Sequence, residues 1–147
     1  PMLERIENAY GAVAEENGQE LTFTINEPGA TVRGDQQLLT QMVANIVENA
    51  LRHCPVGTRV EASLSRADDG VLLQISDNGP GIPAPERDKV FRRFYRLEKS
   101  RTTPGNGLGL SMVKAIAELH EAAVTMDDNN PGLRVSIRFP NGGDTSL

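Results

Sequence analysis

The sequence lacks several features that would each indicate a particular class of protein. Among its 147 residues Cys54 is the only cysteine, so an internal disulfide is impossible and a reducing cytosol suits the chain. No apolar run is long enough to cross a bilayer, and no charged stretch leads into an apolar one as in a secretory leader. Repeats and low-complexity tracts are also absent. We therefore expect one cytoplasmic domain, read as a piece of a longer protein because helical patterning starts directly after Pro1.

Positive charge is scarce overall but concentrated in one stretch. The net charge of −5 argues against nonspecific nucleic-acid binding by the whole domain. Between Arg87 and Arg101, however, seven basic residues stand against two acidic ones. Such a run is often a solvated helix face. Because this one lies between two glycine-rich motifs, it could instead hold a polyphosphate or an acidic partner.

Apolar spacing predicts an α+β fold. Helical periodicity covers 3–13, 38–51 and 110–117, and alternation predicts strands at 21–25, 60–64, 71–75, 124–126 and 133–139. Asp35 is the expected N-cap of the long second helix. A short helix is expected at 85–91, a mobile loop at 95–105, and a frayed polar tail at 141–147 after a domain of residues 1–140. The strands are mostly joined as hairpins, which favours a two-layer arrangement with about three main helices on one face of a mixed, largely antiparallel sheet.

The first motif lies on the long helix. Asn45 and Asn49 are four residues apart, and Arg52 and His53 follow on the same side, away from the apolar stripe. Amide oxygens suit Mg²⁺, which prefers oxygen ligands and commonly bridges a protein to substrate phosphates. The alternative is that both asparagines only bind neighbouring loops. A zinc site is not expected, because neither His53 nor His120 has a second ligand at metal spacing; His120 instead suits a helix C-terminus as a cation.

The second motif follows a predicted strand. Asp77 is followed by Gly79 and Gly81, so a carboxylate at the strand end could accept a hydrogen bond from an adenine amino group while the glycines let the backbone approach a flat ring. The alternative is a simple tight turn. A dinucleotide fold is disfavoured, since Pro83 and Pro85 prevent a helix from starting there.

The third motif directly precedes the third predicted helix. Gly105, Gly107 and Gly109 stand before Leu110, and the free N–H groups of a helix N-terminus attract anions such as phosphate. No Gly-Lys-Ser/Thr follows, so this is not a Walker P-loop.

Together with the segment from Phe91 to Phe94, the three motifs resemble the catalytic and ATP-binding domain of bacterial two-component sensor histidine kinases. That family has the Bergerat fold, shared with DNA gyrase, mismatch-repair ATPases and a heat-shock chaperone. The resemblance covers nearly the whole chain. It implies that Asn49 binds Mg²⁺, that Asp77 binds adenine, and that 95–106 forms an ATP lid whose Arg96, Lys99 and Arg101 are candidates for meeting the γ-phosphate.

The resemblance gives a full set of expected site residues. Asn45, Asn49 and Arg52 are the expected catalytic residues, and Asn49 with Asn45 the expected metal ligands. The expected ATP-binding residues are Asn45, Asn49, Arg52, His53, Asp77, Gly79, Gly81, Ile82, Tyr95, Arg96, Lys99, Arg101, Asn106, Gly107, Leu108, Gly109 and Leu110.

Asn45 indicates what is done with the ATP. Hydrolases of the superfamily carry a glutamate at this position as the general base, and an amide cannot take a proton. Glu48 lies about 300° further around the helix, so it cannot substitute without a change of register. We therefore expect the γ-phosphate to pass to a histidine on a separate dimeric helical domain and from there to a response-regulator receiver domain. The isolated chain is not expected to autophosphorylate, and any membrane contact would come from other parts of the protein.

Two segments depart from the family pattern. Glu121-Ala122-Ala123 stands where a Gly-Gly pair is common, and Pro131-Gly132-Leu133-Arg134 replaces a Gly-x-Gly-Thr pattern. Both are expected to lie away from the phosphates. Alternative functions are a stand-alone anti-sigma-factor serine kinase, a nucleotide-binding pseudokinase or interaction module, and an ATPase that turns over rapidly by itself.

Overall fold

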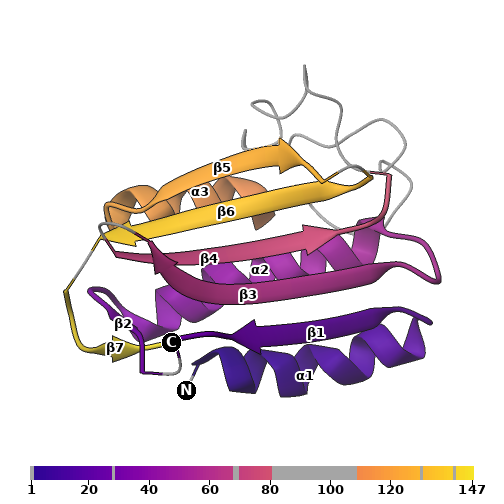
Figure 1. Cartoon of the computed structure of the whole chain (residues 1–147), viewed down its shortest axis with the longest axis horizontal. Helices are drawn as coiled ribbons and strands as arrows, with labels where there is room; N and C mark the ends of the chain where they lie inside the picture. Colours follow the sequence, from indigo (N-terminus) through magenta and orange to yellow (C-terminus); the bar gives the residue numbers. More distant parts are fainter. Residues whose placement is uncertain (1, 28, 68–69, 81–108, 130, 141) are drawn as a thin grey trace.

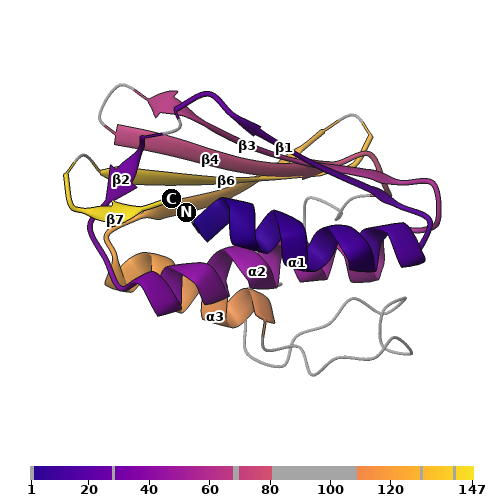
Figure 2. The ribbon, with the colours of Figure 1, turned by 90° about the horizontal axis from the view of Figure 1, so that it is seen from below.

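The fold is a sheet with helices on one face. The computed structural model describes residues 2–27, 29–67, 70–80, 109–129, 131–140 and 142–147. In these ranges, three helices pack on one face of a five-stranded sheet (Figures 1 and 2). The helices are α1 (Met2–Glu16), α2 (Gln36–His53) and α3 (Gly109–Leu119), and the strands are β1 (Glu20–Ile25), β3 (Arg59–Ala67), β4 (Gly70–Asp77), β5 (Ala123–Asp128) and β6 (Leu133–Pro140). The predicted two-layer α+β class is confirmed.

The sheet is mixed and mostly antiparallel, as expected. Its order is β1-β3-β4-β6-β5, so β4 is the central strand. The β3–β4 and β5–β6 hairpins are antiparallel, and β4 also pairs antiparallel with β6. Only the β1–β3 pairing is parallel among the described strands, because α2 carries the chain across between them. The central position of β4 places its last residue, Asp77, in the middle of the sheet edge.

Alternation along the strands fills the space between sheet and helices. In β3 the buried side chains are Val60, Ala62 and Leu64, and in β4 they are Val71, Leu73 and Ile75. Side chains on α2, including Leu39, Val43 and Val47, are 0% exposed and pack against the same core. The polar residues of α2, including Asn45, Glu48 and Asn49, lie outside this apolar stripe and are only partly buried. No helix among the described residues has the length and hydropathy needed to cross a membrane.

Helix α2 is fixed at both ends by polar side chains. Asp35 is its N-cap, as predicted, and the Leu38 amide donates to the Asp35 side chain at 3.0 Å. At the other end, the Gln19 side-chain amide donates to the carbonyls of Leu51, at 2.9 Å, and Cys54, at 2.7 Å. Because these carbonyls have no partner within the helix, Gln19 takes the role of a cap supplied by a distant segment.

Within the described residues 142–147 the polar tail is ordered, which corrects the sequence-based expectation of a frayed tail at 141–147. Strand β7 (Thr145–Ser146) pairs antiparallel with β2 (Thr31–Val32). Leu147 is 4% exposed, and its carbonyl accepts from the Leu3 amide at 2.9 Å. The strand pairing, these backbone hydrogen bonds and the buried Leu147 side chain together hold the tail against β2 and α1. The expected helix at 85–91 and loop at 95–105 lie outside the described residues.

Candidate functional site

The candidate site starts on the polar side of α2. Asn45 and Asn49 are both half-buried, one turn apart, while Ile46 and Val47 between them enter the core. The Asn45 Nδ2 atom is buried and has no hydrogen-bond partner among the described residues. A buried donor without a partner is costly, which makes Asn45 a candidate for contact with a ligand. His53 is half-buried at the end of the helix.

Asp77 is a buried carboxylate held by backbone donors. It is 7% exposed, and its Oδ1 accepts from the Gly79 amide at 2.9 Å and from the Leu133 amide at 3.4 Å. The Asn129 side chain donates to the Asp77 carbonyl at 2.8 Å. No described residue donates to Oδ2. Within the described part of the chain, the carboxylate is therefore fixed through Oδ1 alone, and Oδ2 keeps its capacity to accept a hydrogen bond.

Gly79 connects the second motif to the first. A Cβ atom placed on Gly79 would lie 2.9 Å from the Cys54 sulfur, which belongs to the residue that ends α2. The same atom would lie 3.3 Å from Asp77 Oδ1. The loop after β4 thus packs directly against the end of the asparagine-bearing helix, and a side chain at this position would have to displace the Cys54 sulfur.

The first turn of α3 also lies beside α2. The Gln41 side chain of α2 is 3.8 Å from the Met112 sulfur of α3, and His120 at the far end of α3 meets Asp35 at the start of α2. The two helices are therefore antiparallel neighbours (Figure 2). This order brings Gly109 and Leu110, at the N-terminus of α3, toward the turn of α2 that carries Asn45. Helix N-termini favour anions, and the first turn of α3 contains no acidic residue.

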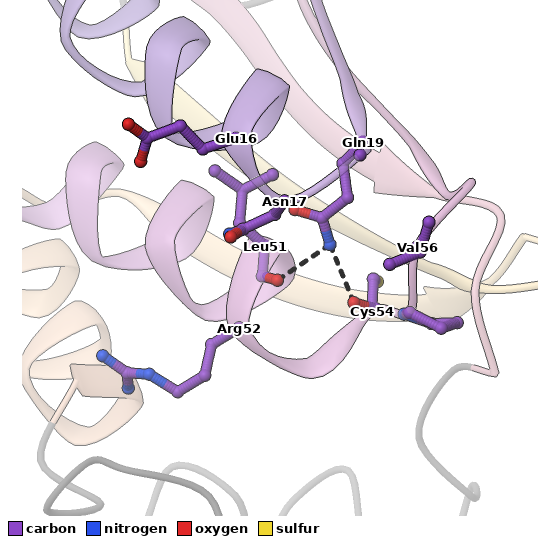
Figure 3. A pocket seen from close by; sticks show the side chains of 9 residues that line it. Glu16, Asn17, Gln19, Leu51, Arg52, Cys54 and Val56 are labelled. Carbon is purple, nitrogen blue, oxygen red and sulfur yellow. Dashed lines mark hydrogen bonds between the residues drawn. The ribbon is translucent and has the colours of Figure 1, made fainter.

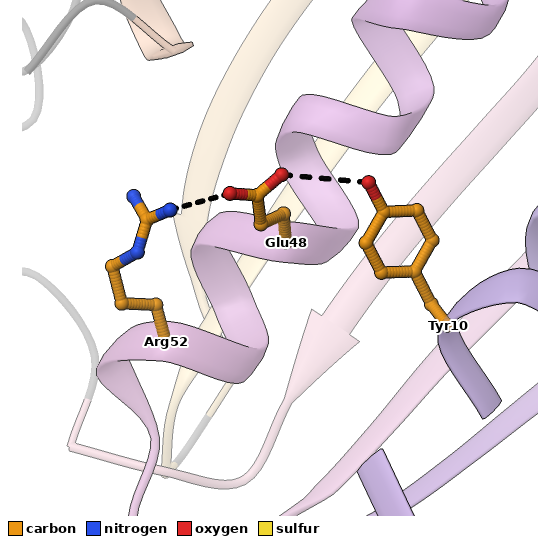
Figure 4. A network of polar contacts seen from close by, with 3 residues as sticks. All are labelled: Tyr10, Glu48 and Arg52. Atoms are coloured by element: carbon orange, nitrogen blue, oxygen red, sulfur yellow. Dashed lines mark hydrogen bonds and ion pairs between the residues drawn. The ribbon is translucent and has the colours of Figure 1, made fainter. Parts of the chain in front are cut away.

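Arg52 has a partner that its sequence pattern did not indicate. Its guanidinium forms an ion pair with Glu48 Oε1, one turn earlier on α2, and the Tyr10 hydroxyl of α1 donates to Glu48 Oε2 at 3.4 Å (Figure 4). Burial raises the pKa of the Tyr10 phenol, and the charge and hydrogen bond of Glu48 raise it further. Tyr10 therefore stays a proton donor toward the carboxylate at neutral pH.

Several predicted site residues cannot be placed, and several others were missed. Gly81, Ile82, Tyr95, Arg96, Lys99, Arg101, Asn106, Gly107 and Leu108 lie outside the described residues. The missed residues are Asn129, Gly132 and Leu133, which surround Asp77. The Pro-Gly pair at 131–132 marked a turn, but nothing in the sequence indicated that this turn meets the end of β4.

His120 lies at the end of α3, as expected, and its ring contacts two backbone groups. Its Nε2 accepts from the Asp35 amide at 3.1 Å, and its Nδ1 lies 2.7 Å from the Ile116 carbonyl, to which it must donate. His120 ties α3 to the start of α2 and is distant in the fold from the three motifs.

A surface hollow of about 660 Å³ lies on the other side of the end of α2 (Figure 3). Its lining includes Glu16, Gln19, Arg52, Cys54 and Val56, and none of Asn45, Asn49 or Asp77. Gln19 Oε1 is buried there without a partner among the described residues. The hollow therefore lies at the junction of α1 and the end of α2, and it shares only Arg52 with the expected site residues.

The donor set suits a cation that takes oxygen ligands and keeps part of its water. Among the described residues there is no group of three or more histidine, cysteine or acidic side chains that could enclose a metal ion. The amides of Asn45 and Asn49 offer two neutral oxygens on one helix face. Mg²⁺ fits such a sparse set, because waters and substrate phosphates complete its coordination.

Comparison with known proteins gives a consistent result. The family model of the histidine kinase-, DNA gyrase B- and HSP90-like ATPases matches residues 34–143. The signal transduction histidine-protein kinase/phosphatase MprB of Mycobacterium sp. (strain KMS) is 41% identical over 114 residues, which are 77% of this chain and 22% of that protein. The chain thus spans less than a quarter of this curated relative.

Two solved structures share both fold and sequence with the chain. The structure of the mycobacterial sensor histidine kinase MprB is 34% identical, with a TM-score of 0.82, and the match covers 99% of this chain and 97% of that one. The ATP binding domain of PrrB from Mycobacterium tuberculosis is 26% identical, with a TM-score of 0.76, and 97% and 93% of the two chains are covered.

Proposed function

The chain belongs to the histidine kinase-, DNA gyrase B- and HSP90-like ATPase family, and we propose that it is the ATP-binding, phosphoryl-donating domain of a two-component sensor histidine kinase. In this proposal it binds ATP with Mg²⁺ and donates the γ-phosphate to a histidine on a separate helical dimerisation domain. The phosphoryl group then passes to a response-regulator receiver domain. The domain works in the cytoplasm, whatever other segments the whole protein has.

The observation that carries the proposal is the arrangement around Asp77. Its carboxylate is buried at the end of the central strand, fixed by two backbone amides through Oδ1, and unpartnered among the described residues at Oδ2. An adenine amino group would donate to Oδ2, and the backbone of Gly79 leaves space for the flat ring. A fixed, charged acceptor selects adenine over bases that present a carbonyl at the same position.

The phosphates would lie along α2 and the start of α3. The N–H groups of the first turn of α3 would donate hydrogen bonds to phosphate oxygens. We propose that Arg52 and the basic residues of 95–106 bind the negatively charged phosphate groups as well. Asn45 and Asn49 would hold Mg²⁺ through their amide oxygens. When bound, that ion neutralises phosphate charge during transfer.

The identity of Asn45 favours transfer over hydrolysis. An amide cannot accept a proton from water, so the chain supplies no general base at the position where hydrolases of the superfamily have one. Glu48 is the nearest carboxylate on the helix, and both of its oxygens are engaged, by Arg52 and by Tyr10. Phosphoryl transfer needs positioning and charge neutralisation more than a base in the donor domain, so ATP can wait for a better nucleophile.

The test is calorimetric titration of ATP into the chain with and without Mg²⁺, with phosphate release followed in the same samples. We expect saturable binding that depends on Mg²⁺, with negligible release. The Asp77→Asn variant should weaken binding about 10- to 100-fold, the size of one lost hydrogen bond to a charged group. Asp127→Asn removes the same charge from the exposed strand β5 and should leave affinity unchanged.

Each other outcome leads to a different function. Steady phosphate release by the unmodified chain would identify an ATPase. Absence of binding would leave an interaction module. Equal affinity in Asp77→Asn and the unmodified chain would remove this carboxylate from the nucleotide site.

A further inference from the structure

Tyr10, Glu48 and Arg52 form a chain of contacts that leads from α1 to the proposed nucleotide site. Glu48 is in its centre, with Oε1 paired to Arg52 and Oε2 accepting from Tyr10 at 3.4 Å (Figure 4). Tyr10 is 38 positions away from Glu48 in the sequence, so this contact depends on how α1 packs against α2. No other described ion pair involves Arg52.

The position of Arg52 makes this contact relevant to the nucleotide. Arg52 follows Asn45 by seven residues and Asn49 by three, so the three side chains start from one stripe of α2. Glu48 lies beside that stripe, on the side of α1. The carboxylate therefore holds the guanidinium between α1 and the face that carries the two asparagines.

The Glu48–Arg52 pair is weak enough to be exchanged. The side chains of Arg52 and Glu48 are 32% and 46% exposed, so solvent screens their attraction. A polyphosphate carries several negative charges and presents the paired oxygens that a guanidinium binds best. A bound triphosphate within reach would thus compete with the single carboxylate for Arg52.

We propose that Glu48 is a positioning residue that holds Arg52 in the nucleotide-free domain, releases it to the phosphates of the bound nucleotide, and thereby changes its own contact with Tyr10 on α1. The inference rests on the proposed function, because it assumes that a nucleotide binds beside α2. It adds a route by which α1 responds to nucleotide occupancy. Arg52 lowers the pKa of Tyr10 while Glu48 raises it, so removal of the guanidinium leaves the phenol facing the carboxylate alone.

The first test is a double-mutant cycle read by calorimetry, with MgATP and adenosine as probes. Glu48→Gln removes the competing charge and should raise the affinity for MgATP about 2- to 5-fold, the range of one exposed ion pair, while leaving adenosine unchanged. In an Arg52→Gln background the same substitution should have no effect. Glu16→Gln removes an equal charge from the same end of the molecule and serves as the control.

The second test needs no substitution at Glu48. The chain has two tyrosines and no tryptophan, so the ring signals of isotope-labelled tyrosine can be assigned by their loss in Tyr10→Phe. Saturating MgATP should shift the Tyr10 signal of the unmodified chain, and it should not do so in Arg52→Gln. This readout also covers the case in which Glu48→Gln fails to fold.

Failure of the inference and failure of the proposed function give different results. If the unmodified chain binds neither MgATP nor adenosine, the proposed function is wrong and the inference falls with it. If MgATP binds but Tyr10 does not shift, the inference alone is overturned. It is also overturned if Glu48→Gln lowers MgATP affinity or leaves it unchanged, changes ATP and adenosine affinity alike, or acts equally without Arg52.

Discussion

At the scale of single residues, Gly132 is where two backbone segments approach most closely at the proposed adenine site. Its φ is +105°, and a Cβ placed on it would lie 1.9 Å from the Asp77 carbonyl oxygen and 2.8 Å from Oδ1. Backbone atoms cannot move aside as a flexible side chain can. The position therefore requires glycine for two reasons: its backbone conformation and the lack of space beside Asp77.

Gly132→Ala should reduce both stability and nucleotide binding. We expect a loss of about 1–3 kcal/mol in the free energy of unfolding, the cost of a strained backbone conformation. Displacement of Asp77 should lower ATP affinity as well. Denaturant unfolding and calorimetry measure the two effects.

The matched control is Gly11→Ala in α1, where a Cβ would have nothing within 4 Å. Because alanine is the better helix former, this change should raise stability by about 0.5–1 kcal/mol. Equal stability of the Gly132→Ala variant and the unmodified chain would mean that the close approach at Asp77 relaxes at no cost.

At the scale of an element, the end of α3 has the hydrogen bonds of a Schellman motif but not its usual residue. The Ala122 amide donates to the Ala117 carbonyl at 2.9 Å, and the Glu121 amide donates to Glu118 at 3.2 Å. Glu121 has a φ of 57°, and it is the only non-glycine residue with a positive φ in the described part of the chain. The Glu-Ala-Ala departure from the family's Gly-Gly pattern thus leaves the motif intact and places a side chain in a left-handed conformation.

Glu121→Gly should therefore stabilise the protein. Removing the side chain from the left-handed conformation should raise the free energy of unfolding by about 1–2 kcal/mol. The greater freedom of glycine in the unfolded chain offsets part of this gain, so the expected net stabilisation is about 0.5–1 kcal/mol. The measurement is the midpoint of urea unfolding. Ala122→Gly, where φ is not positive, should lower the midpoint; a fall in both variants would contradict the account.

At the scale of the whole molecule, the two ends of the described chain hold each other in place. Strands β2 and β7 form a separate two-stranded sheet at one end of the main sheet (Figure 1), and Leu147 enters the core beside α1. The Leu147 amide donates to Ala30 at 3.2 Å, and its carbonyl accepts from Leu3 at 2.9 Å. Leu147 thus forms backbone hydrogen bonds both with the segment before α2 and with the first turn of α1.

Leu147→Ala should destabilise the domain by about 2–4 kcal/mol, as expected when a buried leucine is truncated. The nearby Ser146 is exposed, and Ser146→Ala is the control with little expected change. Thermal unfolding of both variants measures the difference. If the two variants unfold at the same temperature, the tail contributes nothing to the core.

The sequence by itself determined the local structure. Apolar spacing in 38–51 and the Asp35 N-cap define α2, and alternation in β3, β4 and β6 defines the buried face of the sheet, because these patterns depend on neighbours within a few residues. The order of the motifs was sufficient to indicate the family. It also indicated Asp77 and the asparagine pair as candidates, since their chemistry is carried by residue type and spacing.

Only the tertiary structure decided which distant residues act on those candidates. Asn129 and Leu133 donate hydrogen bonds to Asp77, and Glu48 joins Tyr10 to Arg52. Leu147 is buried at the end of a polar tail. The contacts that determine these arrangements join residues far apart in the sequence. Tyr10 and Glu48 are 38 positions apart, and Leu3 and Leu147 are 144 positions apart. Such contacts come from the packing of helices on the sheet, which a local pattern does not contain, because a side chain's distant neighbours are fixed only when the whole core closes.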